Sequence, residues 1–331
     1  MLTNKHIALT GATGFIGSHL LPLLLQSGAT VTCLVRERSK TENLPEGVRI
    51  ETVDLLRGTG LAQALAGQDA FIHLAALLFS CHWKNYLHAN TGAAQTICSA
   101  LTHLGEEAPK KVVLISSMAA TGPSKPDTPV TDETAPHPVS AYGWSKLLVE
   151  RTFQSSYKGD LTILRPSIVY GSGDRGLLPV FRGARFGFCV SPGFGRTFPI
   201  SCIHGSDMAK AICCALTGEK TGIYHVSDGK NYTMDSFCTA LCAALSVKPR
   251  ILHLPLPLLA ATAHVATLFG RLFIRHGRSP NWNSDKYAEA REAGWLCDSS
   301  RLTRDFGFTP SYSLEQGMQE SVAGYRKRGW L

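Results

Sequence analysis

The most constraining feature of this sequence is a glycine-rich turn near its N-terminus. The segment LTGATGFIGSHL follows a strand-like apolar run and opens a helix-like one, with Gly11, Gly14 and Gly17 at intervals of three residues. Glycine permits backbone geometry closed to other residues, lets the main chain approach a bound group closely, and allows tight packing of a helix on a strand. The N–H groups at the start of the helix would attract phosphates. Strand, turn and helix in this order predict a dinucleotide-binding site.

The first half of the chain alternates strand-like and helix-like segments. Strand candidates recur as HIALTG, TVTCLVR, AFIHLAA, KVVLISS and LTILRPSIVYG. This alternation predicts an α/β fold with a doubly wound parallel (Rossmann) sheet covered by helices on both faces. We expect a dinucleotide-binding domain over residues 1–170 and a smaller, discontinuous region over 171–331 that mainly binds substrate. Short strand candidates at 198–204 and 222–227 are expected to return to the first domain.

Composition excludes several classes of protein. The ten cysteines form no C-x-x-C pair and no zinc spacing, so we expect reduced thiols and no metal site. The 33 Lys and Arg exceed the 25 Asp and Glu, which suits an anionic cofactor, but they are scattered and do not indicate a nucleic-acid partner. The N-terminus lacks signal-peptide features, and no unbroken run of eighteen apolar residues occurs. We therefore expect a cytoplasmic protein without a membrane span.

One apolar stretch near the C-terminus allows two interpretations. LPLPLLAATAHVATLFGRLFIRHGR, residues 254–278, ends in basic residues and is interrupted by Pro255, Pro257 and His264, so we expect it to fall short of a span. A buried or lid-like helix is the preferred interpretation. Because of the basic end, peripheral contact with a membrane surface is the alternative.

The segment SAYGWSKLLVE places Tyr142 one helical turn before Lys146. Positions i and i+4 of a helix share a face, so the phenol and the ammonium could reach a common point. A free tyrosine has a pKa of about 10, too high for efficient proton transfer at neutral pH. We expect the charge of Lys146 to lower the pKa of Tyr142, which would make it a proton carrier. The plainer alternative is a solvated pair.

Together the motifs resemble the extended branch of the short-chain dehydrogenase/reductases, the NAD-dependent epimerase/dehydratase superfamily. G-x-x-G-x-x-G, HLAA, VDL, LISSMAATG, Y-x-x-x-K and LRPSIVYGSGD carry this resemblance over most of the chain. It implies hydride transfer with a nicotinamide cofactor and three catalytic residues, Tyr142, Lys146 and Ser117. Tyr142 would carry the proton, Lys146 would also bind the nicotinamide ribose, and Ser117 would polarise the substrate oxygen. Ser116 competes for that last role, but Ser117 is the better match counted back from Gly122.

The resemblance also assigns contacts to the cofactor. These are Gly11, Thr13, Gly14, Phe15, Ile16, Gly17, Arg36, Asp54, Leu55, Leu74, Ala75, Ala76, Tyr142, Lys146, Pro166 and Ser167. Asp54 looks like the carboxylate that meets the adenine. Arg36 ends the second strand, where an NAD-selective site usually has an acidic residue, and a guanidinium pairs well with a 2′-phosphate. NADP(H) is therefore favoured over NAD(H), although Glu37 next to Arg36 could serve either cofactor.

Departures from the family's patterns narrow the reaction. Met118 and Ala119 stand where dehydratases have an Asp–Glu pair, which argues against dehydration. Ile168 and Ile200 replace an Asn and an Arg that nucleotide-sugar enzymes use, which favours a less polar substrate. The pattern is closest to the hydroxysteroid dehydrogenase and dihydroflavonol reductase groups. It implies interconversion of a hydrophobic secondary alcohol and ketone that is steroid-, flavonoid- or lipid-like. The alternatives are a nucleotide-sugar epimerase with tightly bound NAD, or a module that binds the dinucleotide without turnover.

Three further expectations concern the surroundings of the site. An apolar substrate pocket could draw on the 254–274 stretch and on several aromatic residues, most of which are expected to be core. These are Phe79, Trp83, Phe181, Phe186, Phe188 and Phe194. Asp207 is expected to cap the helix that follows it. We also expect a homodimer formed through helices of this fold.

Overall fold

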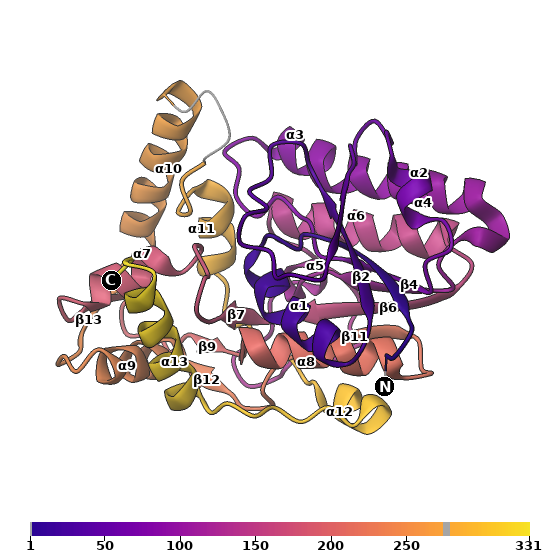
Figure 1. The fold of residues 1–331 in the computed structure, drawn as a ribbon. Helices are drawn as coiled ribbons and strands as arrows, with labels where there is room; N and C mark the ends of the chain where they lie inside the picture. The colour runs from indigo at the N-terminus through magenta and orange to yellow at the C-terminus, as the bar shows by residue number, and fades with distance from the viewer. Residues whose placement is uncertain (1, 274–278) are drawn as a thin grey trace.

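A seven-stranded, all-parallel sheet forms the centre of the computed structural model, which describes residues 2–273 and 279–331 (Figure 1). The strand order β11-β6-β5-β4-β1-β2-β3 reverses between β1 and β4, so the predicted doubly wound sheet is confirmed. The strands are β1 (His6–Thr10), β2 (Thr30–Val35), β3 (Arg49–Thr52), β4 (Ala70–His73), β5 (Lys111–Ile115), β6 (Asp160–Pro166) and β11 (Gly222–Val226).

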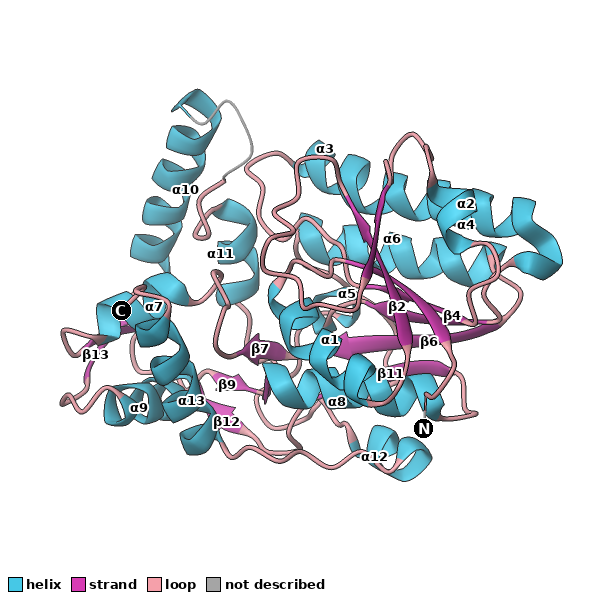
Figure 2. Ribbon diagram, viewed as in Figure 1, coloured by secondary structure: helices cyan, strands magenta, loops and turns pink. Residues whose placement is uncertain are grey.

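Helices cover both faces of this sheet (Figure 2). Side chains alternate across a strand, so Ile7 and Leu9 of β1 pack in one apolar core and Ala8 in the other. The first core includes α1 (Phe15–Gln26) and α8 (Gly205–Thr217); the second includes α2 (Leu61–Leu65), α4 (Ala93–Leu104) and α6 (Ala141–Ser156). Burial on both faces explains why the strands read as continuous apolar runs.

The rest of the chain builds a second region with its own apolar core. Its helices are α7 (Leu178–Ala184), α9 (Met234–Ala244) and α13 (Leu314–Lys327). Three two-stranded sheets pair β7 (Ile168–Tyr170) with β10 (Cys202–His204), β9 (Pro199–Ile200) with β12 (Tyr232–Thr233), and β8 (Phe188–Pro192) with β13 (Arg250–Leu254). Residues 222–226 join the main sheet as β11, but the prediction that 198–204 returns to it is wrong. That segment pairs with β7 and β12, because the chain leaves the main sheet after Ser167, whose N–H bonds to the Val226 carbonyl.

Seven further helical elements complete the fold in the described part of the chain. They are α3 (Trp83–Tyr86), the π-helix η1 (Leu87–Gly92), the 3-10 helix η2 (Gly105–Glu107), α5 (Met118–Thr121), α10 (Leu256–Phe273), α11 (Ser284–Ala290) and α12 (Ser300–Phe306). In Figure 1, α10 projects outward at the upper left, above α7, and α11 lies between α10 and the sheet.

Helix α10 corrects the interpretation of the apolar 254–278 stretch, whose residues 274–278 lie outside the described part. Pro255 precedes the helix and Pro257 is its second residue, where proline is tolerated, so neither interrupts it. With 18 residues, a mean hydropathy of 1.4 and 22% burial, α10 is long and apolar enough to cross a membrane by length and composition. The preferred expectation is a buried or lid-like helix, and the buried alternative is wrong, since the buried residues of α10 are Leu259, Ala263, Thr267 and Gly270.

A buried ion pair fastens α6 to β6 behind the edge of the sheet. The Arg165 guanidinium forms a two-pronged contact with the Glu150 carboxylate, at 2.6 Å (Nη2 to Oε2) and 2.9 Å (Nε to Oε1), and both side chains are almost fully buried. Arg165 also donates to Thr121 Oγ1 at 2.9 Å. The Ser116 hydroxyl donates to Glu150 from the end of β5. Four neighbouring elements therefore share one polar contact in a low-dielectric interior.

Replacing Glu150 by Gln should destabilise the fold strongly, because the buried Arg165 charge would lose its partner. We expect the free energy of unfolding, measured by urea denaturation at pH 7, to fall by about 3–5 kcal/mol. The control is Lys5→Met, which removes an exposed ion pair with Asp69 and should cost less than about 1 kcal/mol. Equal losses in the two variants would contradict a structural role for the buried pair.

Candidate active site

The glycine turn is closely packed and fits a bound phosphate. Gly11 has a φ of +76°, and a Cβ there would lie 2.8 Å from the Ala75 nitrogen. A Cβ on Gly17 would lie 2.5 Å from the Gly11 carbonyl oxygen, so α1 can approach the turn only without a side chain. Gly14 precedes α1, and no side chain caps the first turn of that helix. The turn therefore presents main-chain N–H groups to an anion at a positive helix end.

The predicted cofactor residues lie along one edge of the sheet. This is the carboxyl edge, and the crevice between β1 and β4, where the strand order reverses, is the usual dinucleotide position. Leu74 and Ala75 extend β4 across the glycine turn, with N–H groups 3.3 Å from the Thr10 carbonyl oxygen and Thr10 Oγ1. The remaining predicted residues follow these strands or open α1: Thr13, Phe15, Ile16, Arg36, Asp54, Leu55, Ala76, Pro166 and Ser167.

Arg36 and Asp54 follow the neighbouring strands β2 and β3. Asp54 Oδ1 accepts hydrogen bonds from the N–H groups of Arg57 (3.0 Å) and Leu56 (2.9 Å), which lower the pKa of this carboxyl group. The Arg36 main chain forms a turn with Ser39, and the Arg36 side chain is exposed. A fixed carboxylate and an exposed guanidinium therefore stand beyond adjacent strands, where the adenosine half of a dinucleotide would lie.

Tyr142 is buried in the first turn of α6, with 8% of its surface exposed. Ser117 caps α5, where its Oγ accepts from the Ala119 N–H at 3.1 Å, and its hydroxyl also interacts with the Tyr142 phenol. Ser116 is turned away and donates to Glu150. Of the two candidate serines, the structure brings Ser117 to the tyrosine.

Lys146 does not act on the phenol in the way the helical spacing suggests. Its Nζ donates to the Ile115 carbonyl oxygen at 2.6 Å, and burial lowers its pKa to about 8 against the raising effect of Glu150. The pKa of Tyr142 is raised rather than lowered, because burial outweighs the opposing effects of Lys286 and Ser117. The expected lowering by Lys146 is therefore not found: this ammonium is held by the end of β5.

Helix α11 contributes residues that the sequence analysis missed. Asp285 accepts hydrogen bonds from the N–H groups of Ala141 (2.6 Å) and Tyr142 (3.2 Å), so it caps α6 from a distant part of the chain. Lys286 places its Nζ 4.5 Å from the centre of the Tyr142 ring. No local pattern in NWNSDKYAEA links it to residues 140–142; only the fold brings them together.

Apolar side chains form one part of the surroundings of Tyr142, beside Ser117 and the charged residues of α11, and they differ from the predicted set. Tyr86, Ala119, Leu77 and Trp295 pack against Tyr142, and the Tyr86 and Tyr142 ring centres are 6.0 Å apart. Among the predicted aromatics, Phe79 lies nearby, with its ring 5.7 Å from Lys286 Nζ. The others lie elsewhere: Phe181 is fully buried in the core of the second region, and Trp83, Phe186, Phe188 and Phe194 are exposed.

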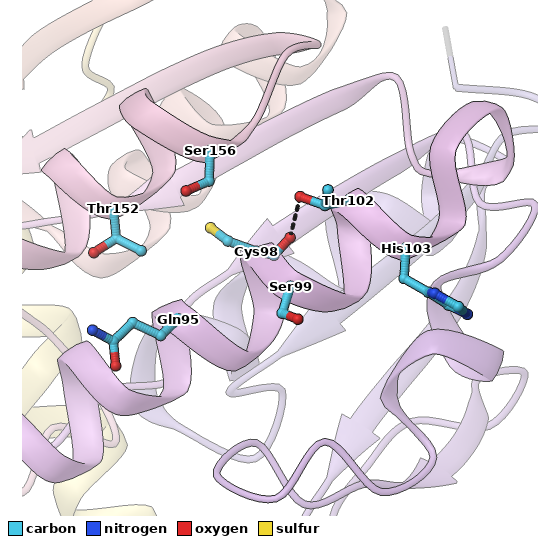
Figure 3. A pocket seen from close by; sticks show the side chains of 7 residues that line it. All are labelled: Gln95, Cys98, Ser99, Thr102, His103, Thr152 and Ser156. Carbon is cyan, nitrogen blue, oxygen red and sulfur yellow. Dashed lines mark hydrogen bonds between the residues drawn. The ribbon is translucent and has the colours of Figure 1, made fainter.

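A hollow of about 520 Å³ lies between α4 and α6, beside the C-terminal half of α6 rather than the first turn that holds Tyr142 (Figure 3). It is lined by Gln95, Cys98, Ser99, Thr102, His103, Thr152 and Ser156. Its polar residues come from the outer faces of both helices. It is therefore separate from the candidate active site.

Two smaller points concern other predicted ligands and caps. Within the described residues, no group of three or more potential metal-ligating side chains occurs. Asp207 does not cap α8; His204 holds that position, and Asp207 Oδ2 accepts from the N–H groups of Ser311 and Tyr312, both at 2.9 Å. Asp207 instead fastens the segment that leads into α13.

The arrangement suits hydride transfer coupled to the movement of one proton. A bound nicotinamide dinucleotide would supply the hydride, held by the glycine turn and the carboxyl edge of the sheet. Tyr142 offers a phenol in a site shielded from water, and Ser117 can hydrogen bond to the same substrate oxygen. Lys146, one turn further along α6, is the residue for which the family resemblance implies a contact with the nicotinamide ribose.

Comparison with known proteins places these features in a family. The model of the NAD dependent epimerase/dehydratase family matches residues 7–227, more than half of the chain. The chain is 27% identical over 330 residues to a ceramide reductase of Caulobacter vibrioides (98% and 96% of the two chains). It is 25% identical over 320 residues to a 4-hydroxy-2-methyl-3-oxo-4-farnesyl-3,4-dihydroquinoline-1-oxide ketoreductase of Stigmatella aurantiaca (93% of each).

A solved structure shares the fold. The UDP-glucose 4-epimerase of Thermus thermophilus in complex with NAD superposes with a TM-score of 0.75 at 22% identity, over 97% of this chain and 99% of that one. The resemblance inferred from the motifs is confirmed, and so is the expectation of an enzyme of this type. The chain belongs to the NAD dependent epimerase/dehydratase family, the extended short-chain dehydrogenase/reductases.

Proposed function

We propose that this enzyme interconverts a hydrophobic secondary alcohol and ketone, with NADP(H) as the hydride carrier and Tyr142 as the proton carrier. The observation that carries the proposal is the setting of Tyr142: a buried phenol next to Ser117, walled by Tyr86, Leu77 and Trp295. An apolar wall favours an apolar substrate. Two relatives have names that mention ceramide and a farnesyl group, which supports a lipid-like ketone.

The alternative is a nucleotide-sugar epimerase, which the family also contains. Such an enzyme would retain NAD through purification and show no net oxidation or reduction. Ile168 and Ile200 stand at the two positions where sugar-nucleotide enzymes have an Asn and an Arg, and neither isoleucine carries a polar group. Ile200 is fully buried in the core of the second region and Ile168 packs against that core. This composition supports the reductase.

Substitution of Tyr142 by Phe should reduce turnover by at least about a hundredfold, because the proton carrier is lost while the ring is kept. The assay follows NADPH absorbance with the ketones 3-ketosphinganine, androstenedione and dihydroquercetin as separate probes. Turnover of UDP-glucose is followed separately, by chromatography of the UDP-galactose that an epimerase would form. Trp144→Phe, at an exposed position of the same helix, is the control and should retain activity. Wild-type rates in the Tyr142 variant, or turnover of UDP-glucose alone, would refute the proposal.

Arg36 should determine the preference for NADP(H). Replacing it by Ala is expected to raise the Kd for NADP⁺ by about tenfold or more, because a charge-assisted contact with the 2′-phosphate is lost. The Kd for NAD⁺ should change less than about twofold by the same reasoning. Isothermal titration calorimetry measures the Kd of both cofactors. The control is Arg49→Ala, because Arg49 is the first residue of β3 and lies at the other edge of the sheet from Arg36. Parallel losses for both cofactors would count against the assignment.

We also infer that α10 lies on the surface of an anionic bilayer. One face of the helix is exposed and apolar, formed by Leu258, Val265, Leu268, Phe269, Leu272 and Phe273. A hollow of about 600 Å³ beside this face, lined by Val265, Phe269 and Pro280 among others, is almost entirely apolar. Cations flank this end of the molecule: Arg271 in the last turn of α10, and Arg185 and Arg250 stacked on the exposed rings of Phe186 and Phe188. Apolar side chains bordered by cations suit anionic lipid.

Vesicle binding tests this surface. The protein should sediment with phosphatidylcholine vesicles that contain phosphatidylglycerol, and salt should weaken the association. Phe269→Glu should reduce the fraction of protein bound to vesicles by about tenfold or more. The substitution replaces a ring that would be buried in the bilayer with a negative charge that the anionic lipid repels. Ile50→Glu, at an exposed apolar position on β3, is the control. Equal binding by both variants would exclude α10 as the contact.

A homodimer in the cytoplasm completes the proposal. Helices α4 and α6 offer a long outer face with the shallow hollow of Figure 3, and Trp144 of α6 is half exposed. A second copy could bury this face. All ten cysteines are free thiols, as a reducing compartment favours.

A further inference from the structure

Lys286 lies against the catalytic phenol. Its Nζ is 4.5 Å from the centre of the Tyr142 ring and 5.7 Å from that of Phe79. The same Nζ forms an ion pair with Glu289 Oε2 at 2.9 Å, and only 20% of the lysine side chain is exposed. A largely desolvated ammonium over an aromatic face acts more strongly on that ring than a solvated one.

The position of Lys286 is fixed from both ends of α11. Asn283 caps the helix by accepting from the N–H groups of Asp285 (3.0 Å) and Lys286 (3.1 Å). Asp285 is bonded to the first turn of α6. Near the other end of α11, Glu289 Oε1 accepts from the Ser140 hydroxyl at 2.7 Å. Helix α11 is therefore bound to the N-terminus of α6 on both sides of Lys286.

Several groups face the Tyr142 phenol. They come from different helices, and some favour the phenolate while others disfavour it. From α11 come Lys286, which favours the phenolate, and Glu289, which disfavours it. Ser117 faces it from the start of α5 and favours the phenolate. Tyr86 of α3 packs beside it, and burial raises the pKa of Tyr86, so this neighbour stays neutral. The remaining charge on the same helix, Lys146, is held by the Ile115 carbonyl.

Asp285 is the third charged side chain of α11 near the site. It is bound to the main-chain N–H groups of α6, and burial raises its pKa against those hydrogen bonds. Burial is also the main reason for the high pKa of Tyr142, and Lys286 is the largest effect that opposes it. The ammonium of Lys286 is therefore the cation whose charge reaches the phenol most directly.

We propose that Lys286, from α11, supplies a positive charge that stabilises Tyr142 as its proton leaves. This inference rests on the proposed function, in which Tyr142 is the proton carrier. During ketone reduction the Tyr142 O–H bond breaks, its proton passes to the substrate oxygen, and the electron pair stays on the phenolate oxygen. The hydride for the carbonyl carbon comes from the reduced nicotinamide cofactor. Lys286 keeps its own protons throughout and acts by charge alone.

The experiment measures Tyr142 itself and needs no substrate. Protein with ¹³C at the Cζ atom of its tyrosines is titrated from about pH 8 to about pH 12.5, because burial raises the pKa of Tyr142 above the ordinary tyrosine value of about 10. The signal missing in Tyr142→Phe identifies Tyr142. In Lys286→Met and Lys286→Gln we expect its phenolate fraction at a given pH to fall by about tenfold, a shift of about one unit, because a cation is removed. Lys286→Arg should restore the wild-type curve.

Lys84→Met is the matched control, since Lys84 stacks on the exposed Trp83 ring and is a lysine on an aromatic face away from Tyr142. The proposal is overturned if the pKa of Tyr142 shifts by less than about 0.3 unit in both Lys286→Met and Lys286→Gln, or if it shifts equally in Lys84→Met. The two hypotheses fail separately. Loss of activity in Tyr142→Phe without a shift in the Lys286 variants refutes the role of Lys286 alone. A shift with full activity in Tyr142→Phe refutes the proposed function instead.

Discussion

The buried pair of Glu150 and Arg165 is the contact on which the active-site geometry depends. Two charges are removed from water here, and they are tolerated because the guanidinium and carboxylate meet at two points and both have further partners. One turn before Glu150 on the same helix is Lys146, and Thr121, at the end of α5, accepts from Arg165. The helix with the tyrosine and the helix that begins after Ser117 are thereby held in register against the sheet.

The polar contacts continue from this pair toward the surface. Thr121 Oγ1 lies 2.8 Å from His225 Nε2, and His225 Nδ1 lies 2.9 Å from Asp132 Oδ1. These contacts link α5 to the edge strand β11 and to the turn-rich segment after α5. This proline-rich segment is also held by main-chain hydrogen bonds, from the Ser124 N–H to the Gly294 carbonyl and from the Val130 N–H to the Leu296 carbonyl. The Asp132 carboxylate adds to these contacts beside the end of α5.

Local sequence patterns were sufficient for the fold and for half of the site. The glycine turn and the Tyr142–Lys146 spacing are contained in short segments, and the alternation of strands and helices determines which edge of the sheet they share. The same patterns could not reveal α11, because its contacts with α6 join residues more than 140 positions apart. The helical i, i+4 rule also misled the electrostatics: it predicts that two side chains share a face, but not that a carbonyl of β5 binds one of them.

The apolar 254–273 stretch shows a similar limit. Composition predicted a buried or lid-like helix, because hydrophobic side chains usually pack inside, yet the outer face of α10 is exposed in the described part of the chain. The hydropathy of a helix indicates that its apolar face is unfavourable in water. It does not indicate whether that face packs on the protein core, on another protein or on a lipid surface. The effect of a proline also depends on its position. Pro257 lies in the first turn of α10, where proline is tolerated, whereas in the middle of a helix it would interrupt the helix.

Hydrogen bonds join α10, the helix with the exposed apolar face, to α11 and the residues just before it. Thr267 Oγ1 accepts from the Ser284 N–H at 2.8 Å, and Trp282 Nε1 donates to Thr262 Oγ1 at 3.0 Å. These hydrogen bonds tie the helix with the exposed apolar face to the segment that leads into the helix carrying Lys286. A displacement of α10 at a surface would therefore be expected to change the distance between Lys286 and the Tyr142 ring.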